Sequence, residues 1–204
     1  MATFSAGVHG YSLKDFSNEN RGLGWMLDPS QCALLVHDFL PYYLEILPEN
    51  LQAELVSNVA EAVSWAQAHD VSVLMTAPRP AALAAQRGLG GKLWGIGPSD
   101  AQTREIILPE LRGCLHIHKR SLSAFYATDL EVELRRLGKT QLVVAGVYVA
   151  GGIVATSFDA LARDLEFFVV ADAVADYTVD RHRFALDQIA GTTGQVVSLV
   201  NLTR

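Results

Sequence analysis

Short apolar runs alternate along the chain with longer segments whose apolar residues recur at helical spacing. Aliphatic and β-branched residues fill Cys32–His37 and Gln141–Val147, whereas one face of the segment 49–69 carries an apolar stripe. Strands that alternate with helices form parallel sheets, and helices cover both faces of such sheets. The pattern therefore predicts an α/β fold, a three-layer α/β/α sandwich.

The expected sheet has six mainly parallel strands, and the expected helices connect them. The strands are Cys32–His37, Val71–Ala77, Leu115–Lys119, Gln141–Val147, Glu166–Ala171 and Gln195–Leu202. The helices are Glu49–His69, Asp129–Leu137, Ile153–Arg163 and Val179–Ala190. We expect residues 1–204 to form one domain, with residues 1–30 as an N-terminal arm because its aromatic side chains need burial. The Gly- and Pro-rich segment Pro78–Asp100 is long for a connector, which indicates a functional segment. Within it, we expect Gly88–Gly97 to be a flexible lid rather than a phosphate-binding loop, because it lacks the Gly-Lys-Ser/Thr ending.

Composition excludes several classes of protein. Apolar residues make up 50% of the chain and charged residues 19%, which suffices for a sizeable core. The net charge is −6 and the basic residues are scattered, so a nucleic-acid partner is not expected. The apolar runs are too short to span a membrane, and the N-terminus does not resemble a signal peptide. Cys32 and Cys114 form no CxxC motif, which favours reduced thiols in a cytoplasmic protein.

Polar side chains stand at the expected carboxyl ends of three strands. These residues are Asp38, Lys119 and Tyr148. Reactive groups of open parallel sheets gather at that edge, so an acid, a base and a phenol form a candidate site. Each residue also has a structural alternative. Asp38 could cap a loop or helix, Lys119 could be a surface lysine and Tyr148 could belong to the core.

Several motifs, in the same order along the chain, resemble those of the isochorismatase family. They are LLVHDF (34–39), QRGL (86–89) with LWG (93–95), KRSLSAF (119–125), GVYVAGGIVATSFDA (146–160), and VADAVADYT (170–178) with HRFAL (182–186). The resemblance covers about residues 20–204. Within the family it is greatest to the stand-alone isochorismatases of phenazine biosynthesis, which carry no carrier-protein domain, and we expect none here.

The resemblance also indicates which chemistry to expect. Most members of the wider superfamily are cysteine hydrolases with an Asp–Lys–Cys triad. Counted back from Asp159, the position of that cysteine corresponds to Gly152, which disfavours a covalent thioester. Glycine at this position is typical of enzymes that cleave an enol ether, and we expect it to leave room where a thiol would stand.

The matching positions imply roles for individual residues. Asp38 would be the general acid, its pKa raised by burial against Phe39, Trp94 and Phe125. Lys119 would oppose that rise and bind substrate or developing negative charge. Arg87 would bind a substrate carboxylate through two parallel hydrogen bonds, and Tyr148 would bind near the pyruvyl group. The expected substrate-binding residues are Arg87, Tyr148, Trp94, Phe125, Gln86 and Ser123, and the catalytic positions are Asp38, Lys119 and Gly152.

The resemblance implies hydrolysis of the vinyl ether of isochorismate, or of its 2-amino-2-deoxy analogue, in secondary metabolism. It implies no metal or cofactor, and it implies a homodimer. His116 and His118 share a strand face, but no third metal ligand is near them in sequence. The chain departs from the family pattern at several positions, namely Leu40, Pro78, Arg120, Ser121 and Ala150. These departures leave open a different small carboxylated substrate, or a non-catalytic binding protein on the same scaffold.

Overall fold

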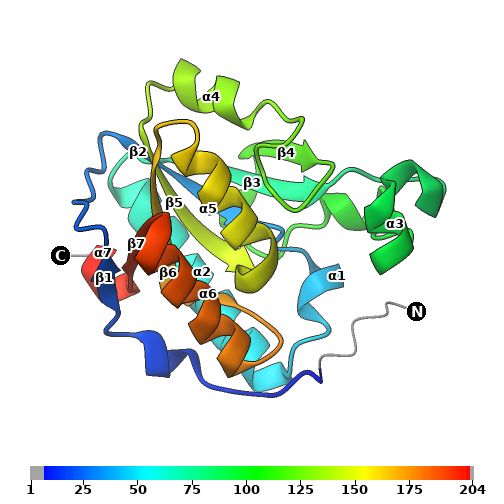
Figure 1. The fold of residues 1–204 in the computed structure, drawn as a ribbon, viewed down its shortest axis with the longest axis horizontal. Helices are drawn as coiled ribbons and strands as arrows, with labels where there is room; N and C mark the ends of the chain where they lie inside the picture. Colours follow the sequence, from blue (N-terminus) through cyan, green and yellow to red (C-terminus); the bar gives the residue numbers. More distant parts are fainter. Residues whose placement is uncertain (1–6, 203–204) are drawn as a thin grey trace.

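The computed structural model describes residues 7–202, in which one sheet carries helices on both faces (Figure 1). Within these residues the sheet has seven strands in the order β1-β7-β6-β5-β2-β3-β4. Strands β2 to β7 are parallel, and β1 pairs antiparallel with β7. The strands are β1 Asn20–Gly22, β2 Cys32–His37, β3 Ser72–Pro78, β4 Leu115–Lys119, β5 Gln141–Val147, β6 Glu166–Ala175 and β7 Gly194–Val197.

Side chains of the central strands alternate between two apolar clusters, one on each face of the sheet. In β2, Leu34 and Val36 pack with α2, whereas Ala33 and Leu35 pack with α4 and α6. Helix α7 joins the α2 face, and α5 joins the α4 and α6 face. The three-layer prediction is therefore confirmed. The helices are α1 Pro41–Leu44, α2 Glu49–Ala68, α3 Leu89–Trp94, α4 Leu130–Arg136, α5 Val154–Leu161, α6 Val179–Thr192 and α7 Leu199–Leu202.

The end of the chain differs from the prediction. The expected strand Gln195–Leu202 is strand only as far as Val197, and its second half is the helix α7. The Asp172 carboxylate accepts a hydrogen bond from the Leu199 amide at 2.9 Å, which satisfies a donor at the start of that helix. Strand β1 was not predicted, because its three residues alternate between exposed and half-buried and carry no apolar signal.

The N-terminal arm packs on α6 and α2. Phe16 stacks on the buried His182 ring at 4.0 Å, and the Tyr11 hydroxyl lies 2.8 Å from His182 Nδ1. The Glu54 carboxylate accepts the Leu13 amide at 2.7 Å. His182 therefore packs between the N-terminal arm and the core. Residues 1–6 of the predicted arm lie outside the described residues, as do residues 203–204 at the end of the predicted domain.

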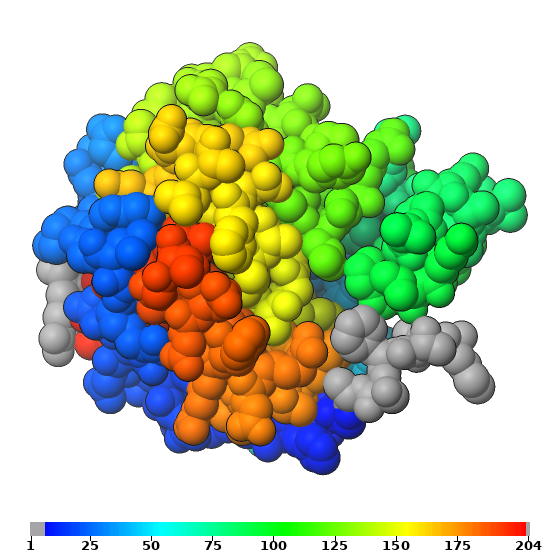
Figure 2. Space-filling view, in the orientation of Figure 1, coloured from blue at the N-terminus to red at the C-terminus, as the bar shows by residue number. Residues whose placement is uncertain are grey.

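The carboxyl ends of the parallel strands form one edge of the sheet. Strand β2 lies between β3 and β5, so the chain leaves β2 in one direction and later returns to its other side. Ligands of open α/β sheets bind at such a reversal of strand order. Beside this edge, the segment that carries α3 projects from the body as a separate lobe (Figures 1 and 2). Among residues 7–202, the helices are too short or too polar to cross a bilayer.

Candidate active site

Asp38 follows β2 directly and is held by the two strands on one side of it. Lys119 Nζ, at the end of β4, lies 2.8 Å from Asp38 Oδ2. The Thr76 hydroxyl, on β3, donates to Asp38 Oδ1 at 2.9 Å and accepts the Asp38 amide at 3.0 Å. Asp38 has φ 48°, a left-handed conformation that is rare outside glycine, and the Thr76 contacts hold it there. The structure thus brings the predicted acid and lysine together.

The Lys119 ammonium is fixed in orientation. Besides Asp38, it donates to the carbonyl oxygens of Ser121 at 3.1 Å and Leu122 at 3.0 Å. An ammonium has three donors, and all three have acceptors here. The side chain is 5% exposed, so the charge acts at close range with little screening by water.

The expected rise in the Asp38 pKa does not occur in the unliganded site. Burial raises the pKa of this carboxyl, but the charge of Lys119 lowers it, as do His37 and the hydrogen bonds from Lys119 and Thr76. The net pKa lies below its ordinary value. The prediction from sequence gave burial too much weight. It had no measure of how close Lys119 comes to Asp38, since this 2.8 Å contact depends on the β3–β4 register that pairs Pro78 with Lys119.

Aromatic side chains surround Tyr148, which follows β5. The Tyr148 hydroxyl donates to the Tyr43 carbonyl oxygen, and the two rings meet edge to face at 6.0 Å. Tyr177 lies on another side of Tyr148, with ring centroids 4.4 Å apart. Burial raises the pKa of Tyr43 and Tyr148, so both phenols stay neutral hydrogen-bonding groups. The charge of Asp38 also raises the Tyr43 pKa, which ties this cluster to the acid.

Asp176 is a site residue that the sequence reasoning missed. Its side chain is fully buried at the end of β6, and Oδ2 accepts the Ala150 amide at 2.8 Å. Oδ1 pairs with Arg181 at 2.7 Å. Asp176 therefore anchors the short π-helical turn η5 (Val149–Ile153), which contains Gly152. The sequence signal that could have identified it is the second Asp of the VADAVADYT motif, which directly follows β6 at the carboxyl edge of the sheet.

The space beside Gly152 is not empty, contrary to the prediction. A Cβ built on Gly152 would lie 2.4 Å from His37 Cε1 and 2.9 Å from His37 Nε2. His37 is fully buried, and its Nδ1 lies 2.8 Å from the Val147 carbonyl oxygen. The imidazole therefore fills the volume in which we expected room for a thiol. Burial lowers the His37 pKa to about 4, so the ring is neutral near pH 7.

Arg87 and its neighbours lie on the projecting lobe. Arg87 ends the turn η2 (Ala84–Arg87), and its Nη1 donates to the Gly95 carbonyl at 2.7 Å. Gln86 Oε1 accepts the Ala82 and Leu83 amides at 2.8 and 3.3 Å, so its carbonyl stabilises the turn. Trp94 is half-buried at the end of α3. Direct substrate contacts of these three residues stay predictions.

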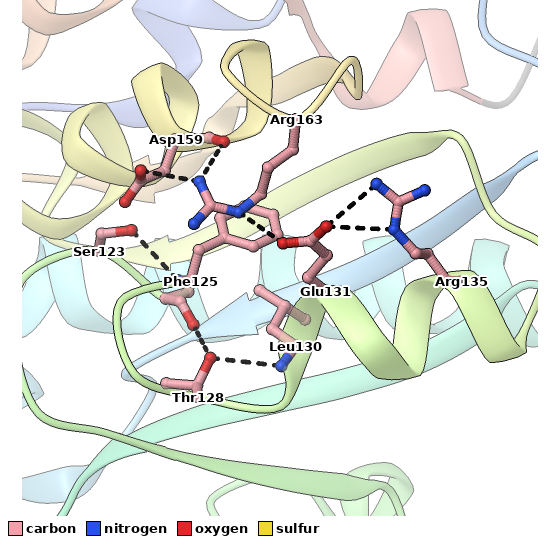
Figure 3. A network of polar contacts seen from close by, with 9 residues as sticks. Ser123, Phe125, Thr128, Leu130, Glu131, Arg135, Asp159 and Arg163 are labelled. Carbon is pink, nitrogen blue, oxygen red and sulfur yellow. Dashed lines mark hydrogen bonds and ion pairs between the residues drawn. The ribbon is translucent and has the colours of Figure 1, made fainter.

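Phe125 does not share the surroundings of Phe39. Its ring belongs to the apolar cluster on the other face of the sheet, where the Arg163 guanidinium lies 4.9 Å from the ring centroid (Figure 3). Contact of Phe125 with Asp38 therefore stays a prediction, and the two rings pack on opposite faces of the sheet. The Ser123 hydroxyl accepts the Phe125 amide at 3.1 Å, so it closes the turn after β4.

Three departures from the family pattern lie near the acid but offer no side-chain donor. Pro78 is buried and pairs with Lys119 in the β3–β4 register. Leu40 is fully buried, and Ala150 is half-buried with its amide bound to Asp176. The unliganded site therefore gets its polar groups from Asp38, Lys119 and Thr76 rather than from these positions.

Comparison with known proteins agrees with this architecture. The chain belongs to the isochorismatase family, whose Isochorismatase domain matches residues 32–200. It is 38% identical over 178 residues to "Phenazine biosynthesis protein PhzD1" of Pseudomonas aeruginosa, which covers 85% of this chain and 86% of the relative. It is 35% identical, with the same coverage, to "Phenazine biosynthesis protein PhzD" of Pseudomonas fluorescens. An isochorismatase family protein from Burkholderia thailandensis superposes with a TM-score of 0.74 at 25% identity, covering 90% of this chain and 96% of that one.

Proposed function

We propose that this protein hydrolyses the vinyl ether of isochorismate or 2-amino-2-deoxyisochorismate, as part of secondary metabolism. The products are pyruvate and a dihydro-hydroxybenzoate or dihydro-hydroxyanthranilate. The observation that carries the proposal is the buried Asp38 carboxyl, which Lys119 and Thr76 hold in a fixed position. The names of the relatives support the choice of substrate class, since two are phenazine biosynthesis proteins.

The location of the two cysteines argues against a thiol nucleophile. Cys32 begins β2 and Cys114 precedes β4, so both lie at the sheet edge opposite Asp38. Burial raises the pKa of both thiols, that of Cys32 to about 11. Neither thiol is placed or ionised for attack at the candidate site, so the reaction must proceed without a protein thioester.

A vinyl ether needs only a proton and water to be cleaved. In our proposal, Asp38 transfers its proton to the terminal methylene carbon, which leaves an oxocarbenium ion. Water adds to that ion, and the hemiketal collapses to pyruvate and the ring alcohol. General acid catalysis of this kind typically contributes about 10²–10⁴-fold to the rate.

Asp38 must then gain its proton together with the substrate, because its pKa is low in the unliganded site. The substrate carries two carboxylates. We propose that Arg87 binds one and that the other lies close to the Lys119 charge, where it competes with the acceptors that the ammonium has in the unliganded site. A carboxylate close to Lys119 would neutralise the charge that holds Asp38 ionised. The Asp38 pKa then rises in the complex, since burial is left as the largest influence on it.

Pyruvate release from three compounds tests the proposal. Purified protein is supplied with isochorismate, 2-amino-2-deoxyisochorismate or chorismate, and pyruvate is measured over time. We expect turnover of one or both of the first two and little from chorismate. If none of the three yields pyruvate, the vinyl ether hydrolase proposal is refuted.

Pro78, Leu40 and Ala150 favour a second candidate, hydrolysis of a different small carboxylated compound on the same scaffold. Apolar side chains at these positions offer no hydrogen bonds for a ring substituent. Thermal stabilisation by a panel of small carboxylates would reveal such a substrate. Stabilisation without turnover of any compound would instead support a non-catalytic binding protein.

We also propose that the protein is a homodimer. The segment that carries α3 projects from the body (Figure 2). Apolar side chains of α3 and its flanks are exposed there, and in a monomer they would face water. They are Leu83, Leu89, Leu93 and Ile96, between 49% and 72% exposed. Light scattering that gives the mass of a single chain at micromolar concentration would refute this proposal.

A further inference from the structure

We propose that His37 is a positioning residue that keeps position 152 without a side chain, and thereby restricts the site to chemistry without a covalent intermediate at that position. The ring is fully buried, and its contact with the Val147 carbonyl, 2.8 Å from Nδ1, fixes its orientation. Held in this way, it occupies the volume of any side chain on residue 152, whose Cβ would lie 2.4 Å from Cε1.

The backbone of Gly152 does not itself require glycine. Its φ is not in the left-handed region, unlike that of Gly146 on β5. A Cβ built on the adjacent Gly151 would meet nothing within 4 Å. The turn η5 therefore has room for a side chain at Gly151 but not at Gly152. The excluding atoms belong to the His37 ring and, at 3.0 Å, to the Leu122 carbonyl oxygen.

The Leu122 oxygen also connects position 152 to the acid. It accepts Lys119 Nζ at 3.0 Å and lies 3.0 Å from the Cβ position of residue 152. Since both distances share this oxygen, the Cβ position of residue 152 lies at most about 6 Å from the ammonium that is paired with Asp38. A thiol next to a cation has a lowered pKa and reacts as a thiolate. The charge near position 152 would thus favour a nucleophile there, whereas the His37 ring occupies the volume that its side chain would need.

A cycle of substitutions tests the steric part by thermal unfolding. Gly152→Ala is expected to lower Tm, and the matched control Gly151→Ala to leave it near the wild-type value. The double variant with His37→Ala and Gly152→Ala should lose less Tm than the sum of the losses of the two single variants, because the smaller side chain at position 37 makes room for the new Cβ. Wild-type Tm for Gly152→Ala, or the absence of this coupling, would overturn the proposal. His37→Val replaces His37→Ala if the latter does not fold.

Alkylation by iodoacetamide tests the electrostatic part without any substrate. The sulfur attacks the reagent's methylene carbon, iodide leaves, and the thiol proton goes to solvent. In His37→Ala with Gly152→Cys, we expect the new thiol to be alkylated at pH 6 at least about tenfold faster than Cys114, whose pKa is raised by burial. Mass spectrometry assigns the modified residue. A rate no faster than that of Cys114 would overturn the proposal. Because neither measurement uses substrate, both outcomes are independent of the proposed vinyl ether hydrolysis.

Discussion

Two clusters of ion pairs in this molecule have similar geometry and very different surroundings. At the carboxyl edge, Lys119 and Asp38 lie 2.8 Å apart with side chains 5% and 11% exposed. Between α4 and α5, Glu131 binds Arg135 and Arg163, each at 3.0 Å, and Arg163 also binds Asp159 (Figure 3). The Glu131 side chain is 38% exposed and that of Arg135 is 66% exposed.

The difference shows that exposure, not distance, decides what an ion pair does. Water and salt screen the pairs of Glu131, so they contribute little to stability and have no reacting group beside them. The Lys119–Asp38 pair is screened little, so the Lys119 charge favours the ionised form of Asp38. The lowered pKa of Asp38 follows, with consequences that can be measured.

The largest expected effect is at the buried cluster. Asp38→Asn removes the transferable proton but keeps the shape of the side chain, so kcat for pyruvate release should fall about 10²–10⁴-fold with little change in KM. Glu131→Gln is the matched control, since it makes the same chemical change in the exposed cluster, and it should keep wild-type kcat. Near-wild-type kcat for Asp38→Asn would remove Asp38 from the mechanism.

The second effect is a pH dependence that only the buried cluster should produce. The reactive form has Asp38 protonated, and the unliganded pKa is below its ordinary value, so kcat/KM should fall about tenfold per pH unit from pH 5 to 7. The fall in kcat should begin at higher pH, because the bound substrate raises the Asp38 pKa. Initial rates across this range give both profiles. Coinciding profiles would contradict proton uptake on binding.

The third prediction concerns Arg87, which we propose binds a substrate carboxylate. Arg87→Ala should weaken binding by about 1.5–3 kcal/mol, mainly through KM, because a charge-assisted pair of hydrogen bonds is lost. Arg87→Lys should recover only part, since an ammonium cannot bind two carboxylate oxygens in one plane. Arg163→Ala, which removes a cation from the exposed cluster, is the control. Normal KM for Arg87→Ala would show that this lobe does not hold the substrate.

The smallest effect should come from the exposed cluster itself. Glu131→Gln should change Tm by less than about 2 °C, because its pairs are screened and its arginines can be solvated instead. Differential scanning calorimetry at low and high salt measures this change. A loss of several degrees that disappears in high salt would show that the exposed network stabilises the fold as a unit, in spite of its exposure.

Local pattern was enough to predict the strands that matter most for the site. Strands β2, β4 and β5 begin and end at the predicted residues. Strands β2 and β5 are buried and almost wholly apolar, whereas β4 is a short segment of alternating apolar and polar residues that ends at Lys119. The sequence alone therefore assigns Asp38, Lys119 and Tyr148 to one edge of the sheet. The predicted strand was wrong after Val197, where α7 follows. The hydrogen bond that caps α7 comes from Asp172 on β6, a strand distant in the sequence.

Properties that depend on contacts between strands could not be predicted. The sign of the Asp38 pKa shift depends on how close Lys119 approaches across β3, and sequence gives no such distance. The space at Gly152 depends on β2–β5 pairing, which sets His37 opposite Gly146 and turns its ring toward η5. The face on which Phe125 packs depends on the turn that follows Lys119, whose direction no periodic pattern records.

In the proposed mechanism, the position of Lys119 makes catalysis sensitive to the outermost parallel strand. Strand β4 is the edge of the sheet, with only Ile117 and Lys119 buried among its residues. Edge segments of this kind open in local fluctuations that cost less free energy than global unfolding. Each such opening would separate the ammonium from Asp38 while the central strands stay paired. Activity should therefore be lost at denaturant concentrations at which far-ultraviolet circular dichroism still reports a folded sheet, and amide hydrogens of β4 should exchange before those of β2 and β5.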